Sequence, residues 1–482
     1  MTPLSDKSTI LQLVALAYEH GVRHVVLCPG SRNAPIVHSF AAFGKFCCHS
    51  VTDERSAGFF AIGIAQKTAA PVAVCVTSGT ALANLYPAVA EAFYQEIPLV
   101  VISADRPHSK LDQLEGQTIP QAGIFGRLSK FSADLPEGDD PETLCYANRL
   151  VNEALLACTF RGNGPVHINV PLSEPLFQFS KTAFPQPRVI RRSREMDFGA
   201  FPRRMIVCGQ SLPQNGVPAL DLPGFVCLAE HLANGRFKNA VGNFDALLAA
   251  ADPETKRRLA PDLLITVGGH IVSKTLRQFL RDFPPREHWQ ISPDGSIADT
   301  FGCLTATLAG TPEQVLAPAE KLPAGDFEAL WRSRAQAVPA TIPQNLQERA
   351  VQAFMQAGEG NNVHLANSSS VRLVQKFPCR AKSVFCNRGT SGIEGTLSAA
   401  LGGNAVDDKA LDCVLIGDLS FFYDMNALCI PSLNSRLRIL LLNNGGGGIF
   451  HKVPGLPVES EAAKFILAPH KVKAADWARS RG

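Results

Sequence analysis

Polar residues stand directly after two apolar runs late in the chain, and their types are those of a metal and anion site. Asp418 follows residues 413–417, and Asn444 closely follows residues 437–442. If these runs are adjacent parallel strands, the carboxylate and the amide emerge at the same end of the sheet. Their oxygens, with a backbone carbonyl, suit Mg²⁺, which also takes phosphate oxygens and water. Glycines 445–448 permit close approach to a diphosphate. We therefore expect a metal–diphosphate site; the alternative is two unrelated turns, because Asp and Asn both favour turns.

Cationic residues form a second set, because several of them stand near the ends of predicted strands. Arginine binds carboxylates through two parallel hydrogen bonds, so such a set suits anionic substrates. Taken singly, each of these residues is more typical of a solvated surface charge. The residues are Arg32, Arg106, Lys274, Arg372 and Arg388.

Nearly continuous apolar strands, alternating with helical segments, must position these side chains. Strands are predicted at 25–28, 72–77, 99–102 and 166–170, then at 205–209, 224–228 and 263–269, and finally at 383–386, 413–416 and 437–442. This alternation indicates parallel sheets covered on both faces, with ligands at the carboxyl ends of the strands. We predict an α/β protein of three consecutive parallel-sheet domains at residues 1–184, 195–345 and 350–482, with a linker at 184–194.

The composition excludes several other classes of protein. Apolar residues make up 46% of the chain and charged residues 18%, and the net charge is +3, which indicates neither disorder nor nucleic-acid binding. No apolar run has the length of a membrane span, and no signal peptide is visible. Thirteen cysteines without a CxxC pair predict reduced thiols and a cytoplasmic protein. Twelve histidines show no HExxH and no repeated ligand spacing, so we expect no zinc site.

Long motifs in both outer domains make the sequence similar to one branch of the thiamine diphosphate enzymes. Those enzymes carry the sequence GDG and, later in the chain, the sequence NN. Here Leu419 stands in place of the second glycine of GDG, and this departure narrows the choice to one branch of those enzymes. From about residue 24 to 456 the sequence resembles the 2-succinyl-5-enolpyruvyl-6-hydroxy-3-cyclohexene-1-carboxylate synthase family. The matching stretches are CPGSRNAPI (28–36), TDERSAGFFAIGIA (52–65), TSGTALANLYPAV (77–89), ADRP (104–107), CNRGTSGIEGTLSAA (386–400), GDLSFFYDMNAL (417–428) and NNGGGGIF (443–450).

The resemblance implies thiamine diphosphate and Mg²⁺ or Mn²⁺ as cofactors, with the pyrimidine bound by the first domain and the diphosphate by the third. Asp53 and Glu54 precede the apolar segment 57–65, where the helix dipole alone would favour them. The resemblance makes Glu54 the catalytic carboxyl group that shuttles a proton beside N1′ of the aminopyrimidine, and leaves Asp53 structural. Ile393 would support the bent cofactor, with ordinary core packing as the alternative. The implied cofactor-binding residues are Glu54, Thr77, Ser78, Gly79, Ser391, Gly392, Ile393, Gly417, Asp418, Leu419, Ser420, Asn444, Ile449 and Phe450, and the implied metal ligands are Asp418, Asn444 and Gly446.

The implied activity is that of a transferase in menaquinone biosynthesis. It would decarboxylate 2-oxoglutarate and add the succinyl-semialdehyde unit to isochorismate in conjugate fashion. The family also implies a homodimer or homotetramer in which each cofactor lies across a subunit interface. The implied substrate residues are Ser368, Arg372 and Arg388, of which the two arginines bind 2-oxoglutarate, and Ser31, Arg32, Arg106, Gln117 and Lys274 for isochorismate.

Two alternatives stay open at the level of sequence. One is another thiamine-dependent 2-oxoacid decarboxylase, or an enzyme like acetohydroxyacid synthase, although the cationic set favours two anionic substrates over pyruvate. The other is a non-catalytic or inactive protein that keeps the fold. It arises because family members continue for some tens of residues beyond the segment 443–450, whereas this chain ends at Gly482. The third domain is accordingly expected to be incomplete at its C-terminus.

Overall fold

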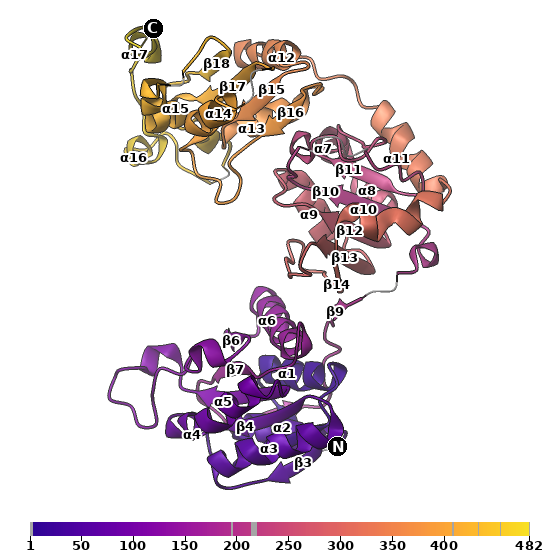
Figure 1. The fold of residues 1–482 in the computed structure, drawn as a ribbon, viewed down its shortest axis with the longest axis vertical. Helices are drawn as coiled ribbons and strands as arrows, with labels where there is room; N and C mark the ends of the chain where they lie inside the picture. Colours follow the sequence, from indigo (N-terminus) through magenta and orange to yellow (C-terminus); the bar gives the residue numbers. More distant parts are fainter. Residues whose placement is uncertain are drawn as a thin grey trace. The chain divides into compact units, whose positions relative to one another are not determined.

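The computed structural model describes residues 3–193, 196–213, 219–406, 409–431, 433–453 and 455–481. The chain divides into two compact units, Met1–Arg192 and Ser193–Gly482. Figure 1 shows that strands and helices alternate along the chain in both units. No helix among the described residues combines the length and the apolar character that crossing a membrane requires.

The first unit is built around a parallel sheet with the strand order β3-β2-β4-β5-β7-β6. Its central strands are buried along their whole length because helices cover both faces of the sheet. A short antiparallel pair, β1 with β8, lies outside this sheet. The strands are β1 (Leu4–Ser5), β2 (His24–Leu27), β3 (Cys47–Ser50), β4 (Val72–Val76), β5 (Leu99–Asp105), β6 (Ser132–Asp134), β7 (Val166–Pro171) and β8 (Phe179–Lys181).

Two hydrophobic cores lie on the two faces of that sheet. One core packs Ile10, Phe40 and Val151 from three helices against Val25 and Val100 of the strands. In the other core, the alternate residues of the strands pack against the remaining helices. Successive residues of a strand point to opposite faces of the sheet, so each core receives every second residue. The helices are α1 (Ser8–Glu19), α2 (Ala34–Phe43), α3 (Glu54–Thr68), α4 (Thr80–Ala83), α5 (Tyr86–Tyr94) and α6 (Pro141–Thr159).

The second unit contains two further parallel sheets. The first has the strand order β11-β10-β12-β13-β14 and is packed on both faces by apolar side chains. Its strands are β10 (Arg204–Cys208), β11 (Val226–Ala229), β12 (Leu263–Val267), β13 (Glu287–Ser292) and β14 (Ala306–Ala309), and its helices are α7 (Phe244–Ala250), α8 (Pro253–Leu259), α9 (Lys274–Asp282), α10 (Pro312–Leu316) and α11 (Asp326–Gln336).

The other sheet of the second unit has the strand order β16-β15-β17-β18. Val363 and Leu415 face one core, and Val414 and Ile416 face the other, so this sheet too is covered on both sides. Its strands are β15 (Asn362–Leu365), β16 (Ser383–Phe385), β17 (Asp412–Gly417) and β18 (Leu437–Leu442), and its helices are α12 (Leu346–Ala357), α13 (Ser369–Leu373), α14 (Thr396–Asn404), α15 (Asp418–Asp424), α16 (Ala463–Leu467) and α17 (Ala474–Arg479).

The observed architecture confirms the predicted α/β class with several parallel sheets, and every strand predicted from an apolar run is present. The predicted linker differs in one respect, because Arg191–Arg192 form the short strand β9, and Arg194 lies outside the described residues. The division into three domains with the predicted boundaries stays a prediction.

Candidate cofactor and substrate site

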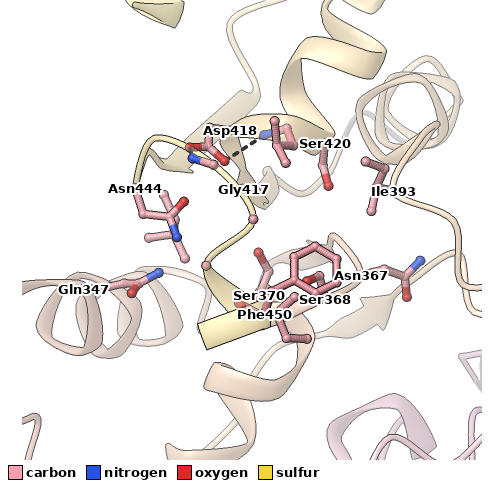
Figure 2. Close-up of a pocket in the computed structure, with 17 residues that line it drawn as sticks. Gln347, Asn367, Ser368, Ser370, Ile393, Gly417, Asp418, Ser420, Asn444 and Phe450 are labelled. Atoms are coloured by element: carbon pink, nitrogen blue, oxygen red, sulfur yellow. Dashed lines mark hydrogen bonds between the residues drawn. The ribbon is translucent and has the colours of Figure 1, made fainter. Parts of the chain in front are cut away.

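A cavity of about 160 Å³ opens at the carboxyl ends of β15, β17 and β18 in the second unit. This is the edge at which open parallel sheets bind ligands, because loops and helix N-termini meet there. Figure 2 shows Asp418 and Asn444 at one side of this cavity and Ile393 at the other. The lining residues are Gln347, Asn367, Ser368, Ser369, Ser370, Ile393, Gly417, Asp418, Leu419, Ser420, Leu442, Asn444, Gly446, Gly447, Gly448, Ile449 and Phe450.

Asp418 is the first residue of α15 and is 2% exposed. Its Oδ1 accepts a hydrogen bond from the backbone of Leu419 at 2.8 Å, and its Oδ2 accepts from the backbones of Gly445 at 2.7 Å and Gly446 at 3.0 Å. The imidazole Nε2 of His470 also lies 3.1 Å from Oδ2. The carboxylate is therefore held in one orientation at the wall of the cavity.

Asn444 lies in the loop after β18, and the surrounding glycines bring backbone close to its side chain. A Cβ on Gly448 would stand 1.9 Å from Asn444 Nδ2, so no larger residue fits there in this conformation. Gly446 has φ of 152° and faces the backbone oxygen of Leu467, where a Cβ would approach to 2.7 Å. The predicted metal ligands Asp418, Asn444 and Gly446 are thus brought to one cavity wall.

Asn367, which the sequence analysis did not single out, connects three segments beside the cavity. Its Nδ2 donates to the carbonyls of Asn387 at 2.7 Å and Gly392 at 2.6 Å, and its Oδ1 accepts from Arg388 Nη1 at 3.1 Å. Ser391, with φ of 60°, lies in the same loop, two residues before Ile393. The sequence held a signal for Asn367, because this residue closely follows the strand β15 just as Asn444 closely follows β18. The signal was missed because β15 was not predicted.

Arg372 and Arg388 are attached to the cavity wall by hydrogen bonds. Arg372 Nη1 donates to the backbone oxygen of Ser368 at 2.6 Å, and Arg388 is bonded to Asn367. Among the described residues, the buried Nε atoms of both arginines have no hydrogen-bond partner, and neither guanidinium forms an ion pair. Burial, with the neighbouring charges of Arg388 and Arg277, lowers the pKa of Arg372. This part of the site is accordingly suited to a bound anion.

Glu230 is the acidic group whose charge reaches this arginine pair, and it was not among the predicted residues. Its carboxylate accepts hydrogen bonds from the backbones of Val272 at 2.8 Å and Ser273 at 2.6 Å. Burial raises the pKa of Glu230 to about 7. The predicted substrate residue Lys274 is the first residue of α9, and its side chain is exposed.

In the first unit, Glu54 is the first residue of α3 and is half-buried. Asp53 precedes it as the N-cap, where its side chain accepts from the backbone of Arg55 at 3.0 Å and from Ser56 Oγ at 2.7 Å. These hydrogen bonds, the Ser56 side chain first, lower the pKa of Asp53. The structural role predicted for Asp53 is confirmed, because it satisfies a free donor at the helix start.

Thr77, Ser78 and Gly79 form the turn after β4. The Oγ of Ser78 is buried and has no hydrogen-bond partner in the part of the chain that the structure describes. The backbone nitrogen of Gly79 donates to Gln121 Oε1 at 2.7 Å. Gly79 has φ of 79°, and a Cβ there would approach the backbone of Gln117 to 3.2 Å. Gln121, a residue that the sequence analysis missed, therefore fixes this turn.

Arg32 and Arg106 follow β2 and β5 in the first unit. Arg32 is 5% exposed, donates to the backbone oxygen of Leu172 at 2.8 Å and pairs with Glu174 at 3.2 Å. Burial and the nearby charge of Arg106 lower the pKa of Arg32. The structure thus brings two predicted cations close to one another at the carboxyl end of the sheet, while Ser31 and Gln117 lie exposed in its loops.

Known proteins are similar to this chain over nearly all of its length. Residues 10–124 match the family described as thiamine pyrophosphate enzyme, N-terminal TPP binding domain. The chain is 48% identical to a 2-succinyl-5-enolpyruvyl-6-hydroxy-3-cyclohexene-1-carboxylate synthase of Bacteroides fragilis, over 99% of this chain and 90% of that protein. The chain belongs to this synthase family. Synthases of the same name from Bacteroides thetaiotaomicron and Desulfotalea psychrophila are 48% and 39% identical, over 99% and 97% of this chain and 90% and 91% of the relatives.

The residues of this chain fit thiamine diphosphate, the cofactor named in the description of the family that matches residues 10–124. A buried carboxylate, an amide side chain and a glycine carbonyl form an oxygen donor set of the kind that Mg²⁺ prefers. The glycine-rich loop leaves room for close backbone approach to phosphate oxygens. His470 adds an imidazole beside Asp418. It follows Asn443 and Asn444 by nearly thirty positions in the chain, so no local sequence pattern indicated that it belongs to the site.

Proposed function

We propose that this protein decarboxylates 2-oxoglutarate and adds the succinyl-semialdehyde unit to isochorismate, in the biosynthesis of menaquinone. The observation that carries the proposal is the cavity wall at which Asp418, Asn444 and Gly446 converge. It occurs in a chain that is 48% identical to a synthase named for the product of this reaction. A buried carboxylate at the wall of a cavity favours a ligand-binding site over the non-catalytic alternative.

Asp418, Asn444 and the Gly446 carbonyl would hold Mg²⁺ or Mn²⁺, and the metal would hold the diphosphate of thiamine diphosphate. Bound thiamine diphosphate supplies a nucleophilic carbon that can attack a keto group and accept the electrons released with CO₂. We assign the other predicted cofactor residues of the second unit, Ser391 to Ile393, Gly417 to Ser420, Ile449 and Phe450, to contacts with the same group. Of these, Ile393, Gly417, Leu419, Ser420, Ile449 and Phe450 line the cavity.

Glu54 would hold and return the proton at N1′ of the aminopyrimidine, with Thr77, Ser78 and Gly79 as further contacts. A carboxyl group at a helix N-terminus, half-buried, is positioned to hydrogen-bond a ligand while remaining able to exchange a proton. The buried and unpartnered Oγ of Ser78 is available to a ligand at the neighbouring turn. Asp53 keeps its capping role and takes no part in this proton transfer.

Arg372 and Arg388 would bind the two carboxylates of 2-oxoglutarate, with Ser368 beside them. The buried Arg388 and the half-buried Arg372, which have no carboxylate partner among the described residues, favour a dianion over pyruvate, which carries one carboxylate. Isochorismate would be bound by Ser31, Arg32, Arg106, Gln117 and Lys274. These side chains bind and orient the two substrates, so much of the rate enhancement would come from positioning.

We further propose that the protein is cytoplasmic and assembles as a homodimer or homotetramer. The resemblance to this family implies such an assembly, in which each cofactor would lie across a subunit interface. Sedimentation analysis of the full chain, with and without thiamine diphosphate, measures the oligomeric state directly.

The proposed activity is tested by incubating the full chain with Mg²⁺, thiamine diphosphate, 2-oxoglutarate and isochorismate. We expect CO₂ release and a product whose mass equals the two substrates minus CO₂. Replacing 2-oxoglutarate by pyruvate is the matched control and should abolish most turnover. Equal turnover of pyruvate would assign the chain to a different thiamine-dependent decarboxylase activity. Absence of CO₂ release despite measurable cofactor binding would favour the non-catalytic alternative.

A further inference from the structure

We propose that His24, Cys47 and His49 form a binding site for a divalent transition-metal ion of the Zn²⁺ type at the edge of the first sheet. The ligand atoms of these three side chains all lie within 4.8 Å of one another. Thiolate and imidazole groups are ligands that Zn²⁺ takes in proteins, so the donor types match. The site involves none of the residues assigned to the cofactor or the substrates.

The register of the sheet creates the cluster. His24 is the first residue of β2, and its Cα partner in the adjacent parallel strand is Cys47, the first residue of β3. His49 stands two residues further along β3, so its side chain projects from the same face of the sheet as that of Cys47. Three side chains on two hydrogen-bonded strands are thereby held together by the backbone, which reduces the entropy lost when a metal binds.

The separation of the two imidazoles suits a shared metal. His24 Nδ1 and His49 Nε2 lie 3.2 Å apart. Two nitrogen ligands at about 2.0–2.1 Å from a tetrahedral Zn²⁺ stand about 3.3–3.4 Å apart, which is close to the observed separation. Phe60 of α3 packs edge-on against His49, with ring centroids 5.4 Å apart, and restricts the rotation of that imidazole. A direct hydrogen bond between the imidazoles is the arrangement that a bound metal would replace.

The edge position leaves the site accessible and its fourth ligand open. Among the described strands, β3 is the last of its sheet and pairs with β2 alone, and Cys47 is exposed. Three protein ligands with a fourth position for water form a common zinc arrangement. A bound ion would also link the edge strand to its neighbour through side chains, in addition to the backbone hydrogen bonds between them.

The test uses the full chain without a histidine tag, freed of metal and kept reduced, and titrates it with Co²⁺ in an excess of Mg²⁺. We expect intense visible bands of tetrahedral cobalt and a thiolate-to-cobalt charge-transfer band, both lost when Zn²⁺ is added. Cobalt held by oxygen ligands around Asp418 gives no charge-transfer band, so that signal separates the two sites. Absence of the band in the wild-type chain overturns the proposal.

Neighbouring residues provide matched variants. Cys47→Ser should abolish the charge-transfer band, whereas Cys48→Ser should keep it, because Cys48 is also exposed but projects from the opposite face of β3. His24→Gln and His49→Gln should each weaken cobalt binding by at least about tenfold. A band that survives Cys47→Ser, or that disappears in Cys48→Ser, contradicts the assignment. Circular dichroism and thiamine diphosphate affinity confirm that each variant is folded.

A second measurement needs no substitution. Alkylation of the reduced wild-type chain is followed by peptide mass spectrometry with and without Zn²⁺. We expect Zn²⁺ to slow modification of Cys47 and to leave that of Cys48 unchanged, because only a metal-bound thiolate is protected. Equal rates at Cys47 under both conditions contradict the proposed site even if every variant fails to fold.

Discussion

Asp418 Oδ2 lies 2.7 Å from the backbone nitrogen of Gly445, so the end of β17 is joined to the loop that follows β18. Asn444 immediately precedes this glycine. One hydrogen bond therefore sets the position of one proposed metal ligand relative to another. A second hydrogen bond, from the backbone nitrogen of Gly446 to the same oxygen at 3.0 Å, reinforces this connection.

Asp418→Asn should abolish Mg²⁺-dependent binding of thiamine diphosphate. The substitution keeps the volume of the side chain, but a neutral amide replaces the charged ligand and presents donors to the Gly445 and Gly446 N–H groups. Calorimetric titration of the cofactor with and without Mg²⁺ measures the effect. Ser398 interacts with another acid of α15, Asp424, and Ser398→Ala serves as a control that should keep cofactor affinity. Unchanged affinity in Asp418→Asn would reject Asp418 as a metal ligand.

Glu54→Gln should bind cofactor but slow hydrogen exchange at its C2 position by about 10²–10⁴-fold. Glutamine keeps the size and the hydrogen-bonding capacity of the residue but cannot accept or return the proton at N1′. Exchange takes place in heavy water, is quenched at set times, and is measured by nuclear magnetic resonance. Asp53→Asn is the matched control, because Asp53 acts as a helix cap, and the wild-type exchange rate should survive there. A wild-type exchange rate in Glu54→Gln would contradict the proton transfer assigned to Glu54.

Mixed chains test whether the proposed oligomer shares its sites. If each cofactor is bound by two subunits, inactive Glu54→Gln and Asp418→Asn chains should regain part of the wild-type activity when they are unfolded and refolded together. The expected reason is that some hybrid sites receive both intact residues. Heterodimers, detected by native mass spectrometry, that show no activity would mean that both residues belong to the site of one subunit.

Arg388→Ala should lose 2-oxoglutarate decarboxylation while thiamine diphosphate affinity stays near that of the wild type. Removing a buried guanidinium leaves a substrate carboxylate desolvated and unpaired, which costs about 2–5 kcal/mol. Arg380→Ala is the control, because Arg380 is 75% exposed and pairs with Glu359 at the surface. Arg32→Ala should instead impair the addition to isochorismate and leave CO₂ release intact. Steady-state assays of the two half-reactions distinguish these outcomes.

His167 should make the first unit less stable as the pH falls. Burial lowers the pKa of His167 to about 3, and its ring nitrogen lies 2.7 Å from Ser103 Oγ. Between about pH 6.5 and about pH 3 the unfolded chain binds a proton that the folded chain does not, so stability decreases by up to about 1.4 kcal/mol for each pH unit in this window. His167→Asn should flatten that slope in denaturant unfolding between pH 7 and pH 5. Parallel slopes in both proteins would contradict this role.

Residues with strong local signals were predictable. Apolar runs identified the central strands, because a strand buried on both faces must be apolar along its length. Asp418 and Asn444 were placed at one end of a sheet because both follow such runs. The cap formed by Asp53 was also expected, since a short acidic side chain before an apolar helix satisfies a free backbone donor.

Strands with polar or short sequences escaped prediction. β3, with the sequence Cys-Cys-His-Ser, lies at a sheet edge where one side meets solvent, and β13 carries polar residues in four of its six positions. β15 is buried, yet it begins with Asn362 and contains His364, whose imidazole is paired with Asp412 at 2.8 Å. Polar side chains that find partners in the folded sheet give no apolar signal in the sequence.

The sequence by itself therefore determined the family, the α/β class and the proposed metal ligands, because each depends on residues that are close in the chain or follow apolar strands. Only the tertiary structure decided that Asn367 joins three loops, that Gln121 holds the turn at Gly79, and that His24 meets Cys47 and His49. These contacts join residues about twenty or more positions apart. Their partners are selected by strand order and register, which arise from the packing of the whole sheet and which no local pattern encodes.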